Sequence, residues 1–135
     1  GKDYVDTLRK YNLIKYARIG GDIDDAVITN FKRLDVLRIP SFGLEGGNTA
    51  AQLIAFVKKV QQHGGMGVIM MHGVGGDYIT ISAKVHQELL NYLKKNKHEI
   101  WVDTFQQVMD YVMKVNKEKS GKINAQAFNN THAPI

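Results

Sequence analysis

The most informative stretch of this 135-residue chain is residues 66–76, which read MGVIMMHGVGG. Its apolar segment, residues 67–72, has the length and character of a buried strand, and the glycines that follow predict a tight turn. Three other apolar runs are bounded by turn residues and predict strands over residues 13–18, 34–39 and 99–103. The histidine of the quoted stretch therefore stands at the carboxyl end of a predicted buried strand.

Helical segments alternate with these strands. Apolar residues recur at helical spacing over residues 49–62, 82–95 and 104–114, so each segment predicts an amphipathic helix. Asn48 and Ser82 stand at the starts of two of these segments and are expected to cap them. The order strand, strand, helix, strand, helix, strand, helix predicts an α/β fold with helices on both faces of a parallel sheet.

The length of the chain predicts one domain, which we place at residues 1–118. Residues 119–135 show no periodicity and are expected to form a C-terminal tail or linker, or a strand for something beyond it. No apolar run approaches the roughly 20 residues of a membrane span, and we recognise no signal peptide in the chain. The chain has no cysteine, which excludes disulfides and thiolate metal sites.

The charge of the chain is positive, with 18 Lys and Arg against 13 Asp and Glu. Much of the excess lies in residues 94–97 and 114–122, near the ends of predicted helices, where cations interact favourably with the helix dipole. No basic stripe is interleaved with stacking aromatic side chains. We therefore interpret these residues as a solvated basic face and expect no nucleic-acid partner.

Three polar residues are expected where strands of the predicted sheet end. Ligands of parallel α/β sheets bind beyond the carboxyl ends of the strands, and Arg18, Ser41 and His72 follow or end the first three strands. His72 can donate a proton to a leaving group, or it can simply cap the carbonyl of a neighbour. Arg18 is either a structural residue of the strand end or a fixed cation that orients a carboxylate or binds an anion.

Other site chemistries have weaker support in the sequence. The acidic residues of 22–25 lack the spacing of a calcium-binding loop and favour turn and capping roles. The glycines of 72–76 lack the Lys-Ser or Lys-Thr of a P-loop, and a triad of Ser41, His72 and Asp103 lacks a nucleophile elbow. Helix surfaces and helix ends are the positions expected for the histidines His63, His86 and His98.

Four groups of motifs carry more information together than separately. They are KYARIGG at residues 15–21, VIMMHGVG at 68–75, ISAKVH at 81–86 with LLNYL at 89–93, and IWVDTFQQVMDY at 100–111. Together they resemble the polysaccharide deacetylase family with its NodB-homology domain, and more closely a bacterial branch of acetyl-xylan esterases and polysaccharide deacetylases. The resemblance runs from about residue 11 to residue 115 and implies the C-terminal half of a distorted (β/α) barrel.

The resemblance also implies an activity and site residues. The family is a group of hydrolases of carbohydrate metabolism that remove N- or O-acetyl groups from polysaccharides by metal-assisted attack of water. By position in the motifs, His72 would be the general acid, Met70 part of the acetyl pocket, Gly73 a substrate-binding residue and Arg18 the residue that orients the base aspartate. In the arginine motif, Ile19-Gly20 departs from the usual Arg-x-Pro form.

The metal-binding motifs of the family are missing from the sequence. Its Thr-Phe-Asp-Asp-Gly strand and His-x-x-x-His pair should precede Arg18, and no two of the five histidines, at 63, 72, 86, 98 and 132, are four apart. The resemblance implies a zinc-like divalent ion in full-length members of the family. We expect no metal on this chain alone, and the chain alone would therefore be inactive.

Three expectations concern the wider context of the chain. A carbohydrate polymer is the expected substrate, and a periplasmic or extracellular location follows from the resemblance because such polymers lie outside the cytoplasm. The exposed edges of half a barrel predict pairing with the missing N-terminal half or with a second copy of the chain. The alternative interpretation is a non-catalytic half-barrel that serves as a carbohydrate-binding or assembly module.

Overall fold

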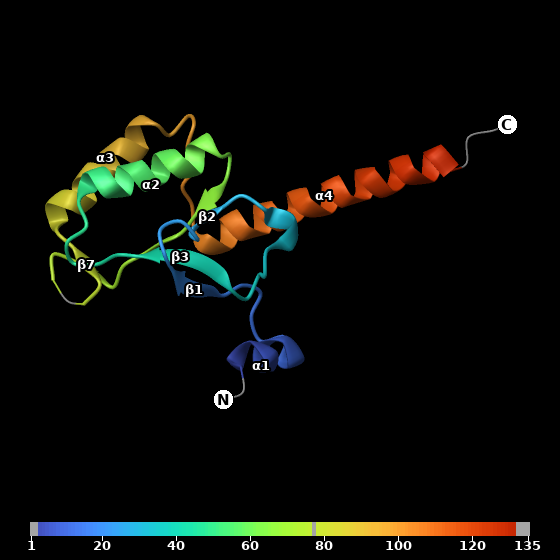
Figure 1. Ribbon diagram of the computed structural model, residues 1–135, viewed down its shortest axis with the longest axis horizontal. Helices are drawn as coiled ribbons and strands as arrows, with labels where there is room; N and C mark the ends of the chain where they lie inside the picture. The colour runs from blue at the N-terminus through green and yellow to red at the C-terminus, as the bar shows by residue number, and fades with distance from the viewer. Residues whose placement is uncertain (1–2, 77, 132–135) are drawn as a thin grey trace. The chain divides into compact units, whose positions relative to one another are not determined.

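A three-stranded parallel sheet organises the first part of the chain. The computed structural model describes residues 3–76 and 78–131, which divide into one unit up to Val102 and another from Asp103. In the first unit, β1 (Arg18–Gly21), β3 (Ile39–Gly43) and β5 (Ile69–Met70) lie in the order β1-β3-β5, as Figure 1 shows in part. The pairing is parallel throughout this sheet. The predicted α/β class with a parallel sheet is therefore confirmed.

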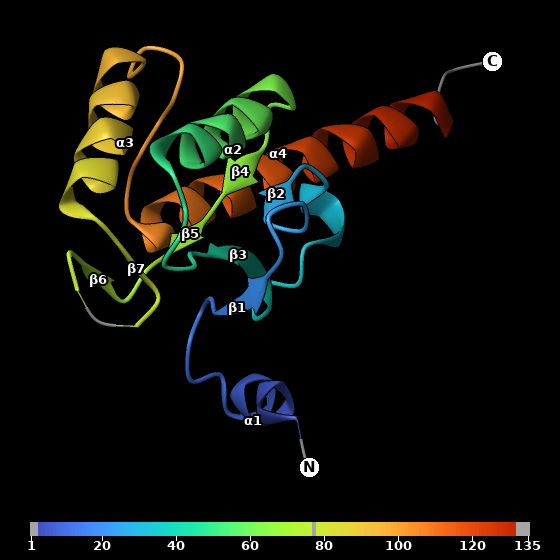
Figure 2. The same cartoon turned by 60° about the vertical axis from the view of Figure 1, so that its left-hand side comes forward.

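Two smaller sheets complete the strand inventory of the described residues. β2 (Val27–Ile28) pairs antiparallel with β4 (Met66–Gly67), and β6 (Gly73–Val74) pairs in parallel with β7 (Thr80–Ile81). In Figure 2, β2 lies beside β4, and β6 lies beside β7. The strands described here do not close into a barrel.

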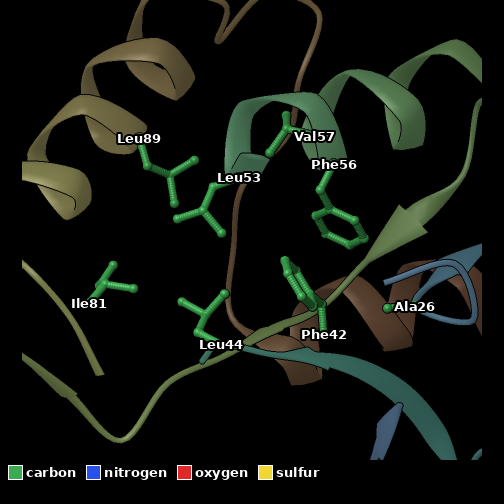
Figure 3. Close-up of a cluster of buried hydrophobic side chains, with 8 residues drawn as sticks. All are labelled: Ala26, Phe42, Leu44, Leu53, Phe56, Val57, Ile81 and Leu89. Atoms are coloured by element: carbon green, nitrogen blue, oxygen red, sulfur yellow. The ribbon is translucent and has the colours of Figure 1, made fainter. Parts of the chain in front are cut away.

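The helix α2 (Ala50–Gln62) packs against one face of the central sheet, and α3 (Ala83–Lys95) packs against α2. Both helices match the predicted segments to within one residue at each end. The rings of Phe42 on β3 and Phe56 on α2 lie 5.3 Å apart between centroids and point toward one another (Figure 3). The buried cluster around them consists of Ala26, Phe42, Leu44, Leu53, Phe56, Val57, Ile81 and Leu89. The alternation of β3 thus turns Phe42 toward the helices.

The starts of both helices are fixed by side-chain caps. Ser82 accepts a hydrogen bond from the backbone N–H of Val85, as predicted. At α2 the cap is Thr49 rather than the predicted Asn48, because Thr49 forms a reciprocal capping box with Gln52. Asn48 instead accepts a hydrogen bond from the N–H of Glu45 and closes the preceding turn.

The predicted strand positions need correction. The first two strands, β1 and β3, begin where the predicted segments 13–18 and 34–39 end, so each begins five residues later than predicted. No strand forms over residues 99–103, where Trp101 and Val102 are 52% and 62% exposed and thus lack a buried face. Pairing with a neighbour, rather than local apolar character, sets where a strand begins and ends.

A short N-terminal helix joins the first unit through charged side chains. α1 (Tyr4–Tyr11) is capped by Asp3, and it ends at Asn12, which adopts a left-handed conformation. Arg9 donates to a carboxylate oxygen of Asp35 at 2.6 Å. Arg38 forms an ion pair with Asp3. A single turn of 3-10 helix, η1 (Phe31–Arg33), precedes this charged segment.

The second unit consists of one long helix, α4 (Phe105–Thr131). The helix predicted over residues 104–114 is confirmed at its start, where Thr104 accepts a hydrogen bond from the N–H of Gln107. It continues to Thr131, whereas residues 119–135 were predicted to form a tail or linker, or a strand. A prediction from apolar periodicity misses a helical segment whose sequence carries no apolar stripe. The predicted boundary at residue 118 lies inside α4, and His132 lies outside the described residues.

Candidate functional site

The candidate site lies where the parallel strands end. β1 ends at Gly21, β3 at Gly43 and β5 at Met70, and His72 follows β5 after one further residue. The side chain of His72 is exposed. The sequence predicted His72 as the last residue of this strand, and the structure places it just beyond β5, at the end from which ligands approach parallel sheets.

Arg18 and Met70 are brought into contact by the sheet. An N–H of the Arg18 guanidinium, Nη1, donates to Sδ of Met70 at 2.6 Å, although the two residues are 52 positions apart in the sequence. Arg18 begins β1 and does not end it, so its predicted place at the strand's carboxyl end is wrong. Its long side chain nevertheless reaches the last residue of β5, two positions before His72.

The register of the sheet explains this contact. Arg18 pairs with Ile39, and Gly43 pairs with Met70, so these residues share one face of the sheet, opposite the face of Phe42. A Cβ atom added to Gly43 would lie 3.0 Å from the Cε methyl of Met70. The missing side chain at Gly43 therefore leaves room for Met70 beside the central strand. Sequence reasoning missed Gly43, since its role depends on the register between β3 and β5.

A short segment after β5 folds back on His72. The backbone N–H of His72 donates to the carbonyl of Ile79 at 2.9 Å. The ring of Tyr78 stands nearly perpendicular to the His72 imidazole, at 72° with centroids 5.7 Å apart. Gly73, the predicted substrate-binding residue, lies in β6 and accepts a hydrogen bond from the Thr80 hydroxyl at 3.1 Å. Sequence reasoning also missed Tyr78, which is separated from the histidine by the glycine-rich turn.

Ser41 does not occupy the place predicted for it. It lies inside β3 rather than after it, and it is fully buried. Its hydroxyl donates to the carbonyl of Ile19 at 2.6 Å, across to β1. Asp103, the third member of the disfavoured triad, belongs to the second unit. The Ser41 hydroxyl thus acts in this structure as a link between two strands.

The acidic segment after β1 forms a turn, as predicted. The carbonyls of Asp22 and Asp24 accept hydrogen bonds from the N–H groups of Ala26 and Val27, and the Asp24 carboxylate pairs with Lys59 at 2.5 Å. Over residues 3–76 and 78–131, no three His, Asp or Glu side chains gather as a metal site would require.

The other described histidines lie away from the strand ends. His63 caps the end of α2 with its ring Nδ1 2.8 Å from the carbonyl of Lys59, and its side chain is exposed. His98 is exposed beside Glu99, with 3.7 Å between the nearest ring nitrogen and carboxylate oxygen. His86 is half-buried within α3. His63 and His98 thus have the exposed positions near helix ends that were predicted for them.

No model of a known family matches the chain, and comparisons with curated proteins and with solved structures found no similar protein. None of the described helices has the length and apolar character needed to cross a membrane. The motifs and the geometry around His72 are therefore the grounds on which a function can be proposed.

Proposed function

We propose that this chain forms the proton-donor side of a carbohydrate deacetylase that hydrolyses N- or O-acetyl groups of a polysaccharide. The observation that carries the proposal is the contact between Arg18 and Met70, two positions before the exposed His72. Two of the four residues that the motifs single out, Arg18 and Met70, are thus in contact, and a third, His72, follows Met70 by two positions. A polymer substrate also fits a periplasmic or extracellular location, which belongs to the same proposal.

The chemistry assigned to His72 is proton donation to the leaving sugar. Hydrolysis of an acetyl ester or amide expels an alkoxide or an amine, and a positioned imidazolium supplies the proton that either group needs. The exposed position of His72 leaves the imidazole accessible to a polymer chain. Histidine suits this role because its charge changes near neutral pH.

Arg18 and Met70 have supporting roles in the proposal. A guanidinium has five N–H donors in a rigid plane, and the contact with Met70 uses one of them. The fixed group can therefore also hold a carboxylate, which is the role that the resemblance implies. The Met70 side chain, lying beside Gly43 and the arginine, supplies an apolar surface for the acetyl methyl group, and Gly73 leaves space for the substrate.

The divalent ion implied by the resemblance does not fit the described residues. An Asp and two His would be needed to hold it, and no such group gathers within residues 3–76 and 78–131. In the family this ion activates the attacking water. We place the ligands of this ion in an N-terminal half of the barrel. Of the acidic and histidine residues described in this chain, we assign a role in the reaction to His72 alone.

The proposal predicts that His72→Ala inactivates the enzyme that carries both halves of the barrel. We expect the release of acetate from an acetylated oligosaccharide to fall by about 10²–10⁴-fold, which is the usual contribution of a general acid. Metal content, measured by elemental analysis, should stay unchanged. His98→Ala is the matched control, because His98 is also exposed but lies beyond α3. Unchanged turnover in His72→Ala would remove His72 from the reaction.

A second candidate function is supported by the open edges of the central sheet. β1 and β5 lie at the two edges of the described sheet, and residues 18, 20 and 21 of β1 are exposed. Such an edge can pair with another chain. On this alternative, the chain is a non-catalytic module for carbohydrate binding or assembly. The two functions differ in whether acetate release depends on His72.

A further inference from the structure

The segment that follows β5 is tied back to His72 by backbone contacts. Besides the hydrogen bond from the N–H of His72 to the carbonyl of Ile79, the N–H of Gly75 donates to the carbonyl of Ile81 at 2.7 Å. The hydroxyl of Thr80 donates to the carbonyl of Gly73. β6 and β7 lie next to one another in Figure 2. The backbone of His72 is thereby fixed relative to residues 78–81.

Ile79 holds this segment in an unusual conformation. Its φ is +51°, in the left-handed region that β-branched residues rarely adopt. Its side chain is partly buried against the cluster that contains Phe42 and Leu53. Apolar packing therefore keeps the Ile79 side chain inward, although the backbone conformation is strained. The preceding residue, Tyr78, is 72% exposed beside the imidazole.

We propose that Tyr78 is a positioning residue for His72. The inference rests on the proposed function, in which the imidazole must point one nitrogen at the leaving group. The hydrogen bond from the His72 N–H to the Ile79 carbonyl fixes the backbone that carries the imidazole. The Tyr78 ring, nearly perpendicular and with its centroid 5.7 Å from that of the imidazole, restricts rotation of the imidazole about its side-chain bonds. The ring contact, and not the phenolic hydroxyl, carries this role.

The contact can be tested by nuclear magnetic resonance on the full 135-residue chain. We expect a nuclear Overhauser effect between the ring protons of His72 and Tyr78, lost in Tyr78→Ala and kept between the rings in Tyr78→Phe. We also expect the His72 ring signals to move in Tyr78→Ala. Tyr4→Ala is the matched control, since Tyr4 is 56% exposed on α1 and should leave these signals in place. No contact in the unmodified chain, or no change in Tyr78→Ala, overturns the proposal.

The catalytic consequence is measured separately, in the enzyme that carries both halves of the barrel. Loss of positioning should lower kcat of Tyr78→Ala by up to about 100-fold and leave KM nearly unchanged, while Tyr78→Phe should restore kcat. Unchanged kcat in Tyr78→Ala, with the ring contact present, rejects the positioning role. If His72→Ala itself has no effect on kcat, the proposed function fails even where the ring contact is observed. The two failures are therefore distinguishable.

Discussion

At the scale of single residues, Gly67 shows how closely the first unit is packed. A Cβ atom added there would lie 2.8 Å from Cζ of Phe56 and 2.8 Å from Cγ2 of Val60, both on α2. These distances are too short for a real contact, so the side chains of Phe56 and Val60, or α2 itself, would have to move. Glycine is required at this position by the close approach of the helix.

Gly67→Ala should therefore destabilise the chain by about 1–3 kcal/mol, the usual range for overpacking. The measurement is the free energy of unfolding from urea titration. Gly20→Ala is the matched control, because nothing lies within 4 Å of the added methyl group and Gly20 is exposed. Its effect should stay within about 0.5 kcal/mol. Equal losses in the two variants would contradict the close packing of β4 against α2.

The candidate site was predictable only in part at this scale. The position of His72 after an apolar run is a local pattern, and the structure places it two residues after β5, although residues 68–71 are half-buried rather than buried as predicted. The contact of Arg18 with Met70 and the space beside Gly43 depend on the strand register, which no local pattern specifies. Tyr78 contacts His72 because the chain folds back after the glycines, and a pattern of neighbouring residues does not predict this contact either.

At the scale of elements, Asp35 supplies one of the contacts that hold α1, through its ion pair with Arg9. Burial alone would raise the pKa of the Asp35 carboxyl, but the hydrogen bonds from the Arg9 side chain and the Leu37 N–H, with the positive charge of Arg9, bring this pKa below its ordinary value of 3.8. A carboxyl whose pKa is lower in the folded than in the unfolded chain stabilises the fold above the unfolded pKa. That contribution is lost as the pH falls through the folded pKa.

We therefore expect Asp35→Asn to lower the free energy of unfolding near pH 7 and to have a smaller effect near pH 3. Urea titrations at both pH values measure this difference. In an Arg9→Gln background the effect of Asp35→Asn should shrink, because the main partner has been removed. The loss should be modest, since both side chains are partly exposed. An effect of Asp35→Asn that does not vary with pH would refute the role of its charge.

The bounds of α2 and α3 were predictable and those of the strands were not, for a physical reason. α2 and α3 begin and end within one residue of the predicted segments, because apolar spacing and caps act within a few residues. β1 consists of Arg-Ile-Gly-Gly, a sequence with little strand propensity, and it forms because β3 lies beside it. Residues 99–103 have the apolar character of a strand but no described partner strand.

At the scale of the whole molecule, the open edge of β1 predicts association. In parallel pairing, alternate residues form hydrogen bonds to the neighbouring strand. Ala17 donates its N–H to the carbonyl of Val36, and its own carbonyl accepts from the N–H of Ile39, the first residue of β3. Gly20 therefore turns its N–H away from β3. We expect light scattering to show a dimer, or a complex with an N-terminal half, and Gly20→Pro to weaken it by removing this donor. A strictly monomeric chain at every concentration would count against edge pairing.

The fold class was predictable at this scale, and the barrel was not. Alternating helices and strands predict a parallel α/β arrangement from local patterns alone, and the first unit has one. A half-barrel requires a strand order and curvature that the described sheets do not specify, so this finer assignment stays a proposal. The length of α4 escaped prediction because its later turns carry no apolar stripe.

The central claim, that His72 protonates the leaving group, is tested most directly by varying that group. The enzyme carrying both halves, with and without His72→Ala, is assayed on an acetylated oligosaccharide and on nitrophenyl acetate, whose leaving group needs no proton. We expect a loss of about 10²–10⁴-fold in kcat on the oligosaccharide and a far smaller loss on the aryl ester. Equal losses on both substrates, or none on either, would contradict proton donation by His72.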